Sequence, residues 1–252
     1  MTPPPRPHFV RLYPEIGQAG SLQTAIQTAL DHAGYELTAL LTSSPGWWDC
    51  ATWVDNGNRH VSIVLGSQER WFLMEFWERG VRMADGKTTD LAAAAGATGL
   101  WQTGSRLREL QAAWPFVRYG KLAEAYEHGN PVETKWEIYR QSQARHIDHD
   151  LIEAAYAQPK LRELFPFTSH ATLHLSRCAR YPFTADLPAI TPVADGTYEV
   201  AWPTDSPYGS GTVGRADTPQ DAIALVTSHL PDNYGHAVDA TAKDGLDKTD
   251  ST

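Results

Sequence analysis

The chain has 252 residues, a net charge of −9 from 21 basic and 30 acidic side chains, and a hydrophobic fraction of 42%. That fraction is ample for a core, whereas the acidic balance disfavours nonspecific binding to nucleic acid or anionic membranes, which needs clustered Lys and Arg. Two cysteines, Cys50 and Cys178, exclude a disulfide framework and a four-thiolate zinc site. Since no apolar run approaches the length of a membrane helix and no signal segment opens the chain, we expect a cytoplasmic protein.

The N-terminal part of the chain is predicted to be rich in strands. Residues 1–8 are proline-rich and expected to be disordered. Ser21 is expected to cap a helix over 22–32, and the segment Asp55-Asn56-Gly57-Asn58 predicts a hairpin because Asn and Gly accept positive φ. The predicted strands cover residues 37–41, 49–54, 59–65 and 70–78, and a short helix over 91–95 follows them.

The middle of the chain is predicted to be helical, and period-two alternation returns after it. The predicted helices cover residues 105–113, 120–128, 132–143 and 147–164, and the later strands cover 172–178, 196–202 and 211–215. Thr218 and Pro219 are expected to open a last helix over 220–229. We therefore predict an α+β fold with an N-terminal antiparallel sheet, a helical middle and a C-terminal β-β-β-α segment.

We expect one domain over residues 9–240, followed by a disordered tail over 241–252. Its predicted sub-parts are a sheet-rich region over 9–104, a helical region over 105–168 and the β-β-β-α segment over 169–240. The nine tryptophans and ten tyrosines suit a core, an oligomer interface such as that of a homodimer, or a pocket for a planar ligand.

Glu75 is the sharpest chemical hint in the sequence. Strand side chains project alternately to opposite faces, so Glu75 is expected to share a face with Trp71, Leu73 and Trp77. A carboxyl in apolar surroundings has a raised pKa and can act as an acid and a base near neutral pH. The structural alternatives are a bulge that turns the carboxylate outward, or an ion pair with Arg59 or with Arg79.

Two further groups of residues are candidates. Glu69, which begins the same strand, is the alternative acid/base, although a strand end is usually exposed to water. Arg59 and His60 open the preceding strand, where the Arg59 guanidinium could clamp a substrate carboxylate or pair with Glu75.

The histidines give little support for a metal site. His146 and His149 open a predicted helix, where a capping turn is the favoured interpretation, and no third ligand stands at a recognisable spacing. His170 and His174 would share one strand face, which usually indicates an ordinary sheet surface. The chain also lacks a Gly-x-Gly-x-x-Gly motif and a P-loop, so we expect no metal and no nucleotide cofactor.

Four stretches carry a resemblance to a known family: ERWFLMEFWERGVRMADGKTTDLA from Glu69, WPFV from Trp114, LIEAAYAQPKLRELFPFTSHATLHLSRC from Leu151 and YPFT from Tyr181. From about Tyr13 to Ala240, the chain resembles a family of largely uncharacterised actinobacterial natural-product biosynthesis proteins. The bacterial β-carboline-forming Pictet–Spengler enzymes are similar to this family. The resemblance implies condensation of a tryptophan-like amine with an aldehyde, followed by ring closure onto the indole.

That chemistry implies a role for each candidate residue. Glu75 would be the acid/base, Arg59 would bind the amino-acid carboxylate, and His60 would contact the aldehyde-derived oxygen. The indole would lie against Trp71, Leu73 and Trp77. The chain departs from the family at Arg79, which stands four residues beyond Glu75, where members carry phenylalanine; Arg79 is included among the substrate-binding candidates.

The resulting prediction is a cofactor-independent cyclase that forms a β-carboline scaffold from an aromatic amino acid and an aldehyde. The alternative is a noncatalytic protein that binds a small molecule or a protein through an aromatic-lined surface. An enclosed cavity beside Glu75 would favour the cyclase, and a flat exposed patch would favour the binding protein.

Overall fold

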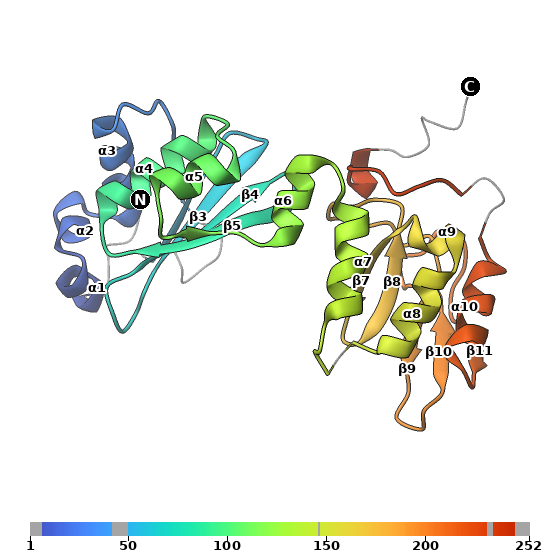
Figure 1. Cartoon of the computed structure of the whole chain (residues 1–252). Helices are drawn as coiled ribbons and strands as arrows, with labels where there is room; N and C mark the ends of the chain where they lie inside the picture. Colours follow the sequence, from blue (N-terminus) through green and yellow to red (C-terminus); the bar gives the residue numbers. More distant parts are fainter. Residues whose placement is uncertain (1–6, 42–49, 146, 231–233, 245–252) are drawn as a thin grey trace. The chain divides into compact units, whose positions relative to one another are not determined.

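The computed structural model describes residues 7–41, 50–145, 147–230 and 234–244. The chain divides into two compact units, residues 1–127 and 128–252, and each is described by itself (Figure 1). The prediction of a single domain over 9–240 stays a prediction. The predicted fold class is confirmed, because the chain combines an N-terminal antiparallel sheet, a helical middle and a C-terminal antiparallel sheet with a helix.

The first unit is built on a six-stranded antiparallel sheet whose strands follow one another in sequence order. The strands are β1 (Ala39–Leu41), β2 (Ala51–Asp55), β3 (Arg59–Leu65), β4 (Phe72–Glu78), β5 (Val81–Thr88) and β6 (Val117–Arg118). The helices are α1 (Pro7–Leu12), α2 (Pro14–Ala19), α3 (Leu22–His32), α4 (Leu91–Gln102), α5 (Leu107–Ala113) and α6 (Lys121–His128), the last of which ends at the boundary. Pro7 and His8 begin α1, contrary to the disorder predicted for residues 1–8, of which 1–6 lie outside the described residues.

Local signals in the sequence account for several of these elements. The Ser21 side chain accepts a hydrogen bond from the backbone N–H of Thr24, 3.0 Å away, and caps α3 as predicted. The hairpin between β2 and β3 is also confirmed, with Gly57 at a φ of 92°. Of the strand predicted over 49–54, Asp49 lies outside the described residues.

Helix α4 continues seven residues beyond the predicted end at Ala95, and its glycines let large rings approach closely. A Cβ added at Gly96 would stand 2.3 Å from Trp114, and one added at Gly99 would stand 2.2 Å from Tyr35. Helices α3 and α4 contact one face of the sheet, and the buried Phe72, Met74 and Phe76 belong to its core. We call this the covered face; Figure 1 shows α4 and α5 running along one side of the strands.

The second unit is built on a five-stranded antiparallel sheet of order β11-β10-β9-β8-β7. The strands are β7 (Phe165–Ser169), β8 (Thr172–Ser176), β9 (Ala189–Pro192), β10 (Tyr198–Ala201) and β11 (Thr212–Ala216). The helices are α7 (Pro131–Gln141), α8 (His149–Ala157), α9 (Pro159–Arg162), α10 (Pro219–Thr227) and the 3₁₀ helix η1 (Ala242–Asp244). Leucines of β8 and aliphatic residues of α8 and α10 share one buried cluster.

The second unit corrects several sequence predictions. Strands β7 and β9 were not predicted; each contains a proline, which is rare in the interior of a sheet. The helix predicted over 147–164 divides into α8 and α9 at Gln158, which precedes Pro159. The tail predicted to be disordered begins with η1, and residues 245–252 lie outside the described ranges.

Within the described ranges, no helix combines the length and the apolar character needed to cross a membrane. The same ranges hold no group of three or more His, Cys, Asp or Glu side chains placed to bind a metal. His146 lies outside them, and Asp148 caps α8 by accepting a hydrogen bond from the backbone N–H of Leu151 at 3.0 Å. The predicted capping turn is therefore confirmed.

Candidate functional site

The reverse face of the first sheet, opposite the covered face, carries Glu75. Residues of β3 and β4 that oppose one another on it are Ser62 with Glu75 and Val64 with Leu73. The predicted alternation along β4 is correct, since Leu73, Glu75 and Trp77 are more exposed than the intervening Phe72, Met74 and Phe76. However, the face that is buried in the core is the one that carries Phe72, Met74 and Phe76. The face that carries Glu75 is exposed to solvent.

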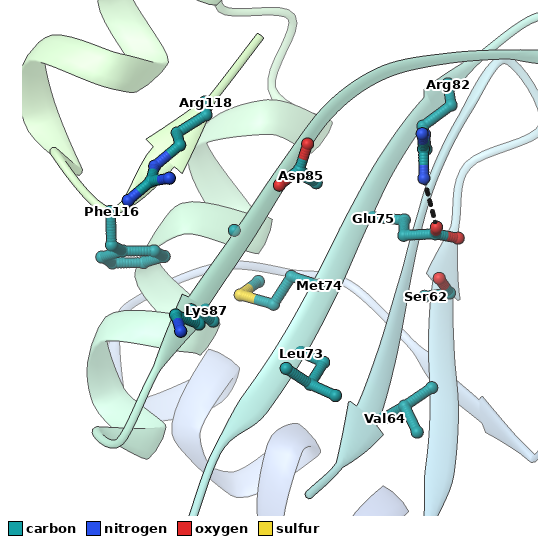
Figure 2. Close-up of a pocket in the computed structure, with 11 residues that line it drawn as sticks. Ser62, Val64, Leu73, Met74, Glu75, Arg82, Asp85, Lys87, Phe116 and Arg118 are labelled. Carbon is teal, nitrogen blue, oxygen red and sulfur yellow. Dashed lines mark hydrogen bonds and ion pairs between the residues drawn. The ribbon is translucent and has the colours of Figure 1, made fainter. Parts of the chain in front are cut away.

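The predicted dry setting of Glu75 is therefore wrong. Its side chain is 42% exposed and its Oε1 accepts a hydrogen bond from Nη1 of Arg82, 2.9 Å away on β5 (Figure 2). Leu73, its expected apolar neighbour, is also 42% exposed. The partner of Glu75 is thus neither Arg59 nor Arg79, but an arginine that the sequence analysis did not consider.

A cavity of about 610 Å³ lies on the reverse face beside Glu75. Figure 2 shows Phe116 and Arg118 along one rim and Glu75, Arg82 and Ser62 along the other. Its lining residues come from four adjacent strands and the turn before β6: Ser62, Val64, Leu73, Met74, Glu75, Arg82, Asp85, Gly86, Lys87, Phe116 and Arg118. The cavity has apolar and charged walls, so it can hold a ligand with both kinds of surface.

The close approach of β6 to β5 shapes one end of the cavity. Gly86 opposes Val117, and a Cβ added at Gly86 would stand 3.2 Å from the Phe116 ring. The glycine therefore lets the Phe116 ring pack against the sheet. Arg118 opposes Asp85 in the same pairing and is exposed on the reverse face.

His60 lines a second cavity of about 290 Å³ with Trp53, Asp55 and Ser62. Its ring stacks on that of Trp77, with centroids 5.5 Å apart. Burial lowers the pKa of His60, while the carboxylates of Asp55 and Glu75 act in the opposite direction. His60 and Trp77 are therefore brought together, but neither lines the larger cavity beside Glu75.

Arg59 lies on the covered face and is held by the backbone of the first unit. Its Nη1 donates to the carbonyl oxygens of Trp101 at 3.0 Å and Ser105 at 2.8 Å, and its guanidinium lies 3.9 Å from the Trp101 ring centroid. An ion pair with Glu78 at 3.2 Å completes this arrangement. The structure thus separates Arg59 from Glu75 by the thickness of the sheet and gives its side chain a structural role.

The remaining candidates lie at the edges of the reverse face. Trp71 donates from Nε1 to Glu69 at 3.0 Å, and Nζ of Lys87 lies 4.7 Å from a Trp71 ring centroid. Arg79 stands with Gly80 at positive φ in the turn between β4 and β5, and its backbone N–H bonds to Asn58. Neither Trp71 nor Arg79 lines the cavity, so their assignment as substrate-binding residues stays a prediction.

Sequence reasoning missed five charged or aromatic residues of the cavity: Arg82, Asp85, Lys87, Phe116 and Arg118. Asp85 and Lys87 alternate along β5 in the manner of a solvent-facing strand, a signal that the sequence does contain. Arg118 belongs to the two-residue strand β6, and Phe116 directly precedes it. This segment is too short to show a periodic pattern.

In the second unit, the predicted histidine pair does not share a strand face. His170 stands with Ala171 at positive φ in the turn between β7 and β8, while His174 lies within β8. The His174 ring stacks on Phe167 with centroids 4.8 Å apart, and burial lowers the pKa of His174. Burial likewise raises the pKa of the Cys178 thiol to about 11, so this cysteine is held as an inert thiol.

Comparison with known proteins gives one match, over residues 130–241, to a family described as "Family of unknown function (DUF6193)". No curated protein and no solved structure matches the chain. Two of the stretches that suggested a family resemblance, those beginning at Leu151 and Tyr181, fall inside the matched residues, whereas those beginning at Glu69 and Trp114 fall outside them. The match covers less than half of the chain and carries no assigned activity. Most of the second unit is therefore similar to this family, and the unit that contains the cavity lies outside the match.

Proposed function

We propose that this protein binds a small molecule, and that the ligand occupies the cavity on the reverse face of the first sheet. The observation that carries the proposal is the exposure of apolar surface inside a cavity of about 610 Å³. Leu73 opposes Val64 there, and Leu73 keeps 42% of its surface exposed. Cavities of roughly 300–1,000 Å³ with a few polar groups are typical of small-molecule sites.

The charged residues around this apolar strip support a ligand site over an ordinary sheet surface. They come from three strands and surround Leu73, Val64 and Phe116. An apolar contact surface provides affinity, while a few placed polar groups fix the orientation of the ligand. The proposal corresponds to the noncatalytic alternative that the sequence left open.

A binding screen on the full chain tests the proposal. Fragment-sized aromatic and aliphatic compounds would be screened by ligand-observed NMR, and the affinity of each hit would be measured by calorimetry. We expect Leu73→Asp to abolish binding, because it places an unpaired charge in the apolar strip. Leu40→Asp is the matched control, since Leu40 is 37% exposed and opposes Trp53 on the same sheet without lining the cavity.

Two results would contradict the proposal. One is a screen without any hit, and the other is a set of hits that bind the Leu73→Asp variant as tightly as the unaltered protein. Loss of binding in both variants would indicate general damage to the sheet, so circular dichroism would be recorded for each variant first.

The cyclase predicted from the sequence is a second candidate, and one observation favours it. Glu75 lines the cavity, so a ligand bound there would contact a carboxylate. Proton transfer by a placed side chain accelerates a reaction by roughly 10²–10⁴-fold. However, Glu75 is exposed and Arg59 lies on the covered face, so the site lacks the dry carboxyl and the carboxylate clamp that the sequence predicted for a cyclase.

Incubation with tryptophan and small aldehydes, followed by mass spectrometry, tests this second candidate. A cyclase would form β-carboline products faster than the uncatalysed reaction, and Glu75→Gln would lower the rate about 100-fold or more. Product formation at the uncatalysed rate across a range of aldehydes would remove the hypothesis without affecting the binding proposal.

A further inference from the structure

Within the described residues, some of the charged side chains around the cavity form an ion pair, and others do not. Glu75 and Arg82 form an ion pair with Oε1 and Nη1 2.9 Å apart, so together they contribute no net charge. The other charged residues of the lining are Asp85, Lys87 and Arg118. Two cations and one carboxylate therefore determine the net charge that a ligand would meet.

The two cations are available to a ligand. Arg118 is exposed, and its side chain makes neither a hydrogen bond nor an ion pair with the part of the chain that the structure describes. Lys87 is also exposed, and its described contact is the one with the Trp71 ring at 4.7 Å. Asp85 opposes Arg118 across the strands, yet the described geometry holds no ion pair between the two side chains.

This excess of positive charge contrasts with the whole chain, which carries a net charge of −9. A concave surface with an excess of one sign of charge and partly apolar walls attracts a ligand of the opposite sign. The cations lie beside Phe116 and Leu73, so an anionic group bound by Arg118 would leave the rest of the ligand over apolar side chains (Figure 2).

We infer that the ligand of this cavity is an organic carboxylate with a flat apolar body, whose carboxylate is bound by Arg118 and Lys87. The inference rests on the proposed small-molecule-binding function and adds the chemical class of the ligand. The arginine fork can donate two parallel hydrogen bonds to one carboxylate, and lysine contributes a point charge beside it. The apolar body lies on Leu73, Val64 and Phe116.

Three naphthalene probes of matched size and different charge test the inference on the full chain: naphthalene-2-carboxylate, naphthalene-2-carboxamide and naphthalen-2-ylmethylammonium. Inorganic phosphate is the fourth probe, an anion without an apolar body. We expect the carboxylate to bind about tenfold more tightly than the amide, because hydrogen bonds to a charged group are roughly twice as strong as hydrogen bonds between neutral groups. A tenfold difference in Kd corresponds to about 1.4 kcal/mol. We also expect this preference to decrease as salt is added, because salt screens exposed charges.

Charge-removing variants provide the second measurement. Arg118→Gln and Lys87→Gln should each weaken carboxylate binding about three- to tenfold and leave the affinity for the amide unchanged. Arg108→Gln is the matched control, because Arg108 is 85% exposed on α5, outside the cavity, and its loss changes the net charge by the same amount.

The outcomes separate the two proposals. Equal binding of the carboxylate and the amide, or tighter binding of the ammonium probe, would overturn the inference while leaving the small-molecule function standing. Phosphate binding as tight as that of naphthalene-2-carboxylate would also overturn it, since the apolar body would then contribute nothing. If no naphthalene probe binds, and the wider screen gives no hit, the proposed function itself fails.

Discussion

Each of the two sheets has helices packed on one face, and the two sheets differ in the residues on the opposite face, which we call the reverse face in both. In the first sheet, Glu75 and Arg82 are paired while 42% and 54% exposed, beside a cavity. In the second sheet, the reverse face of β7 and β8 carries Phe165, Phe167, His174 and Ser176. There the chain folds back after β8 and covers the face with its own side chains.

Phe183 packs on this face. Its ring stacks on Phe167 with centroids 4.3 Å apart and on Phe165 with centroids 5.5 Å apart. The segment that carries Phe183 is held by Ser176, whose Oγ accepts hydrogen bonds from the backbone N–H groups of Cys178 at 2.9 Å and Thr184 at 3.0 Å. Alternation along a strand thus creates two faces, and the segments that pack on the sheet determine which face remains available to a ligand.

The largest expected effect concerns the buried ion pair of the second unit. The Asp186 side chain is 4% exposed. It accepts hydrogen bonds from Nε of Arg177 at 2.6 Å and from the hydroxyl of Tyr234 at 2.9 Å. Burial, together with the negative charge of Asp186, raises the pKa of Tyr234, so this hydroxyl stays a donor. We expect Asp186→Ala to destabilise the second unit by about 3 kcal/mol, because it leaves a largely buried guanidinium without its partner.

Hydrogen–deuterium exchange of peptides from β8 to β10, measured in the full chain, checks this effect within the unit concerned. Asp186→Asn is the control, since it keeps the shape and one acceptor and should cost less. An unchanged exchange rate in Asp186→Ala would contradict the view that this pair holds the segment over the sheet.

The next effect compares one apolar side chain from each reverse face. Phe183→Ala removes a ring packed between two others, and we expect it to destabilise the second unit by about 2 kcal/mol. Leu73→Ala removes a side chain that is already 42% exposed, so we expect a loss below about 1 kcal/mol in the first unit. Urea titration monitored by hydrogen–deuterium exchange in each unit measures the two losses of stability. Equal losses would contradict the expected difference between the two reverse faces.

The pH dependence distinguishes the two faces through His174 and His60. Burial lowers the pKa of His174 from its ordinary value of 6.5, so the unfolded state takes up a proton first as the pH falls. The stability of the second unit should therefore be highest above about pH 6.5 and decrease toward the lowered pKa. In His174→Gln, the stability measured by urea titration should vary less over this window.

His60 should give a weaker version of the same dependence in the first unit. Burial lowers its pKa as well, but Asp55 and Glu75 oppose the shift. Two results would contradict this prediction. One is a stability that depends more steeply on pH in the first unit than in the second. The other is a pH dependence of the second unit that His174→Gln does not alter.

The smallest expected effect is that of Glu75→Gln on stability. The ion pair with Arg82 is about half exposed, and such surface pairs contribute roughly 0–1 kcal/mol. We expect the free energy of unfolding of the first unit, measured by urea titration, to change by less than about 1 kcal/mol. A loss of stability as large as that expected for Asp186→Ala would mean that Glu75 is needed for the fold, and that it does not merely line the cavity.

Much of the local structure could be predicted from the sequence by short-range physics. Ser21 and Asp148 cap their helices, the Asp55–Asn58 turn forms its hairpin, and the two faces of β4 carry the expected residues. These features depend on neighbours within a few positions along the chain, where sequence spacing fixes spatial spacing.

The candidate site could not be predicted in the same way, because it depends on pairing between distant segments. The sequence placed Glu75 among aromatic residues, but α3 and α4 pack on the opposite face of the sheet and leave Glu75 exposed. Likewise, Arg59 and Glu75 lie on adjacent strands, but Glu75 pairs with Ser62, which stands three positions from Arg59 along β3, so the alternation of β3 places Arg59 and Glu75 on opposite faces. Arg118 reaches the cavity only because β6 pairs with β5, through residues more than thirty positions apart.

The amino-acid sequence by itself determined the fold class, the caps of α3 and α8, the hairpin between β2 and β3 and the side chains that share each face of β4, because these depend on the local geometry of the backbone. The tertiary structure alone decided which face of each sheet is buried, which charges are paired and where a cavity forms. Those properties depend on the packing of segments that are remote in the sequence, since burial and electrostatic interaction act through space and not along the chain.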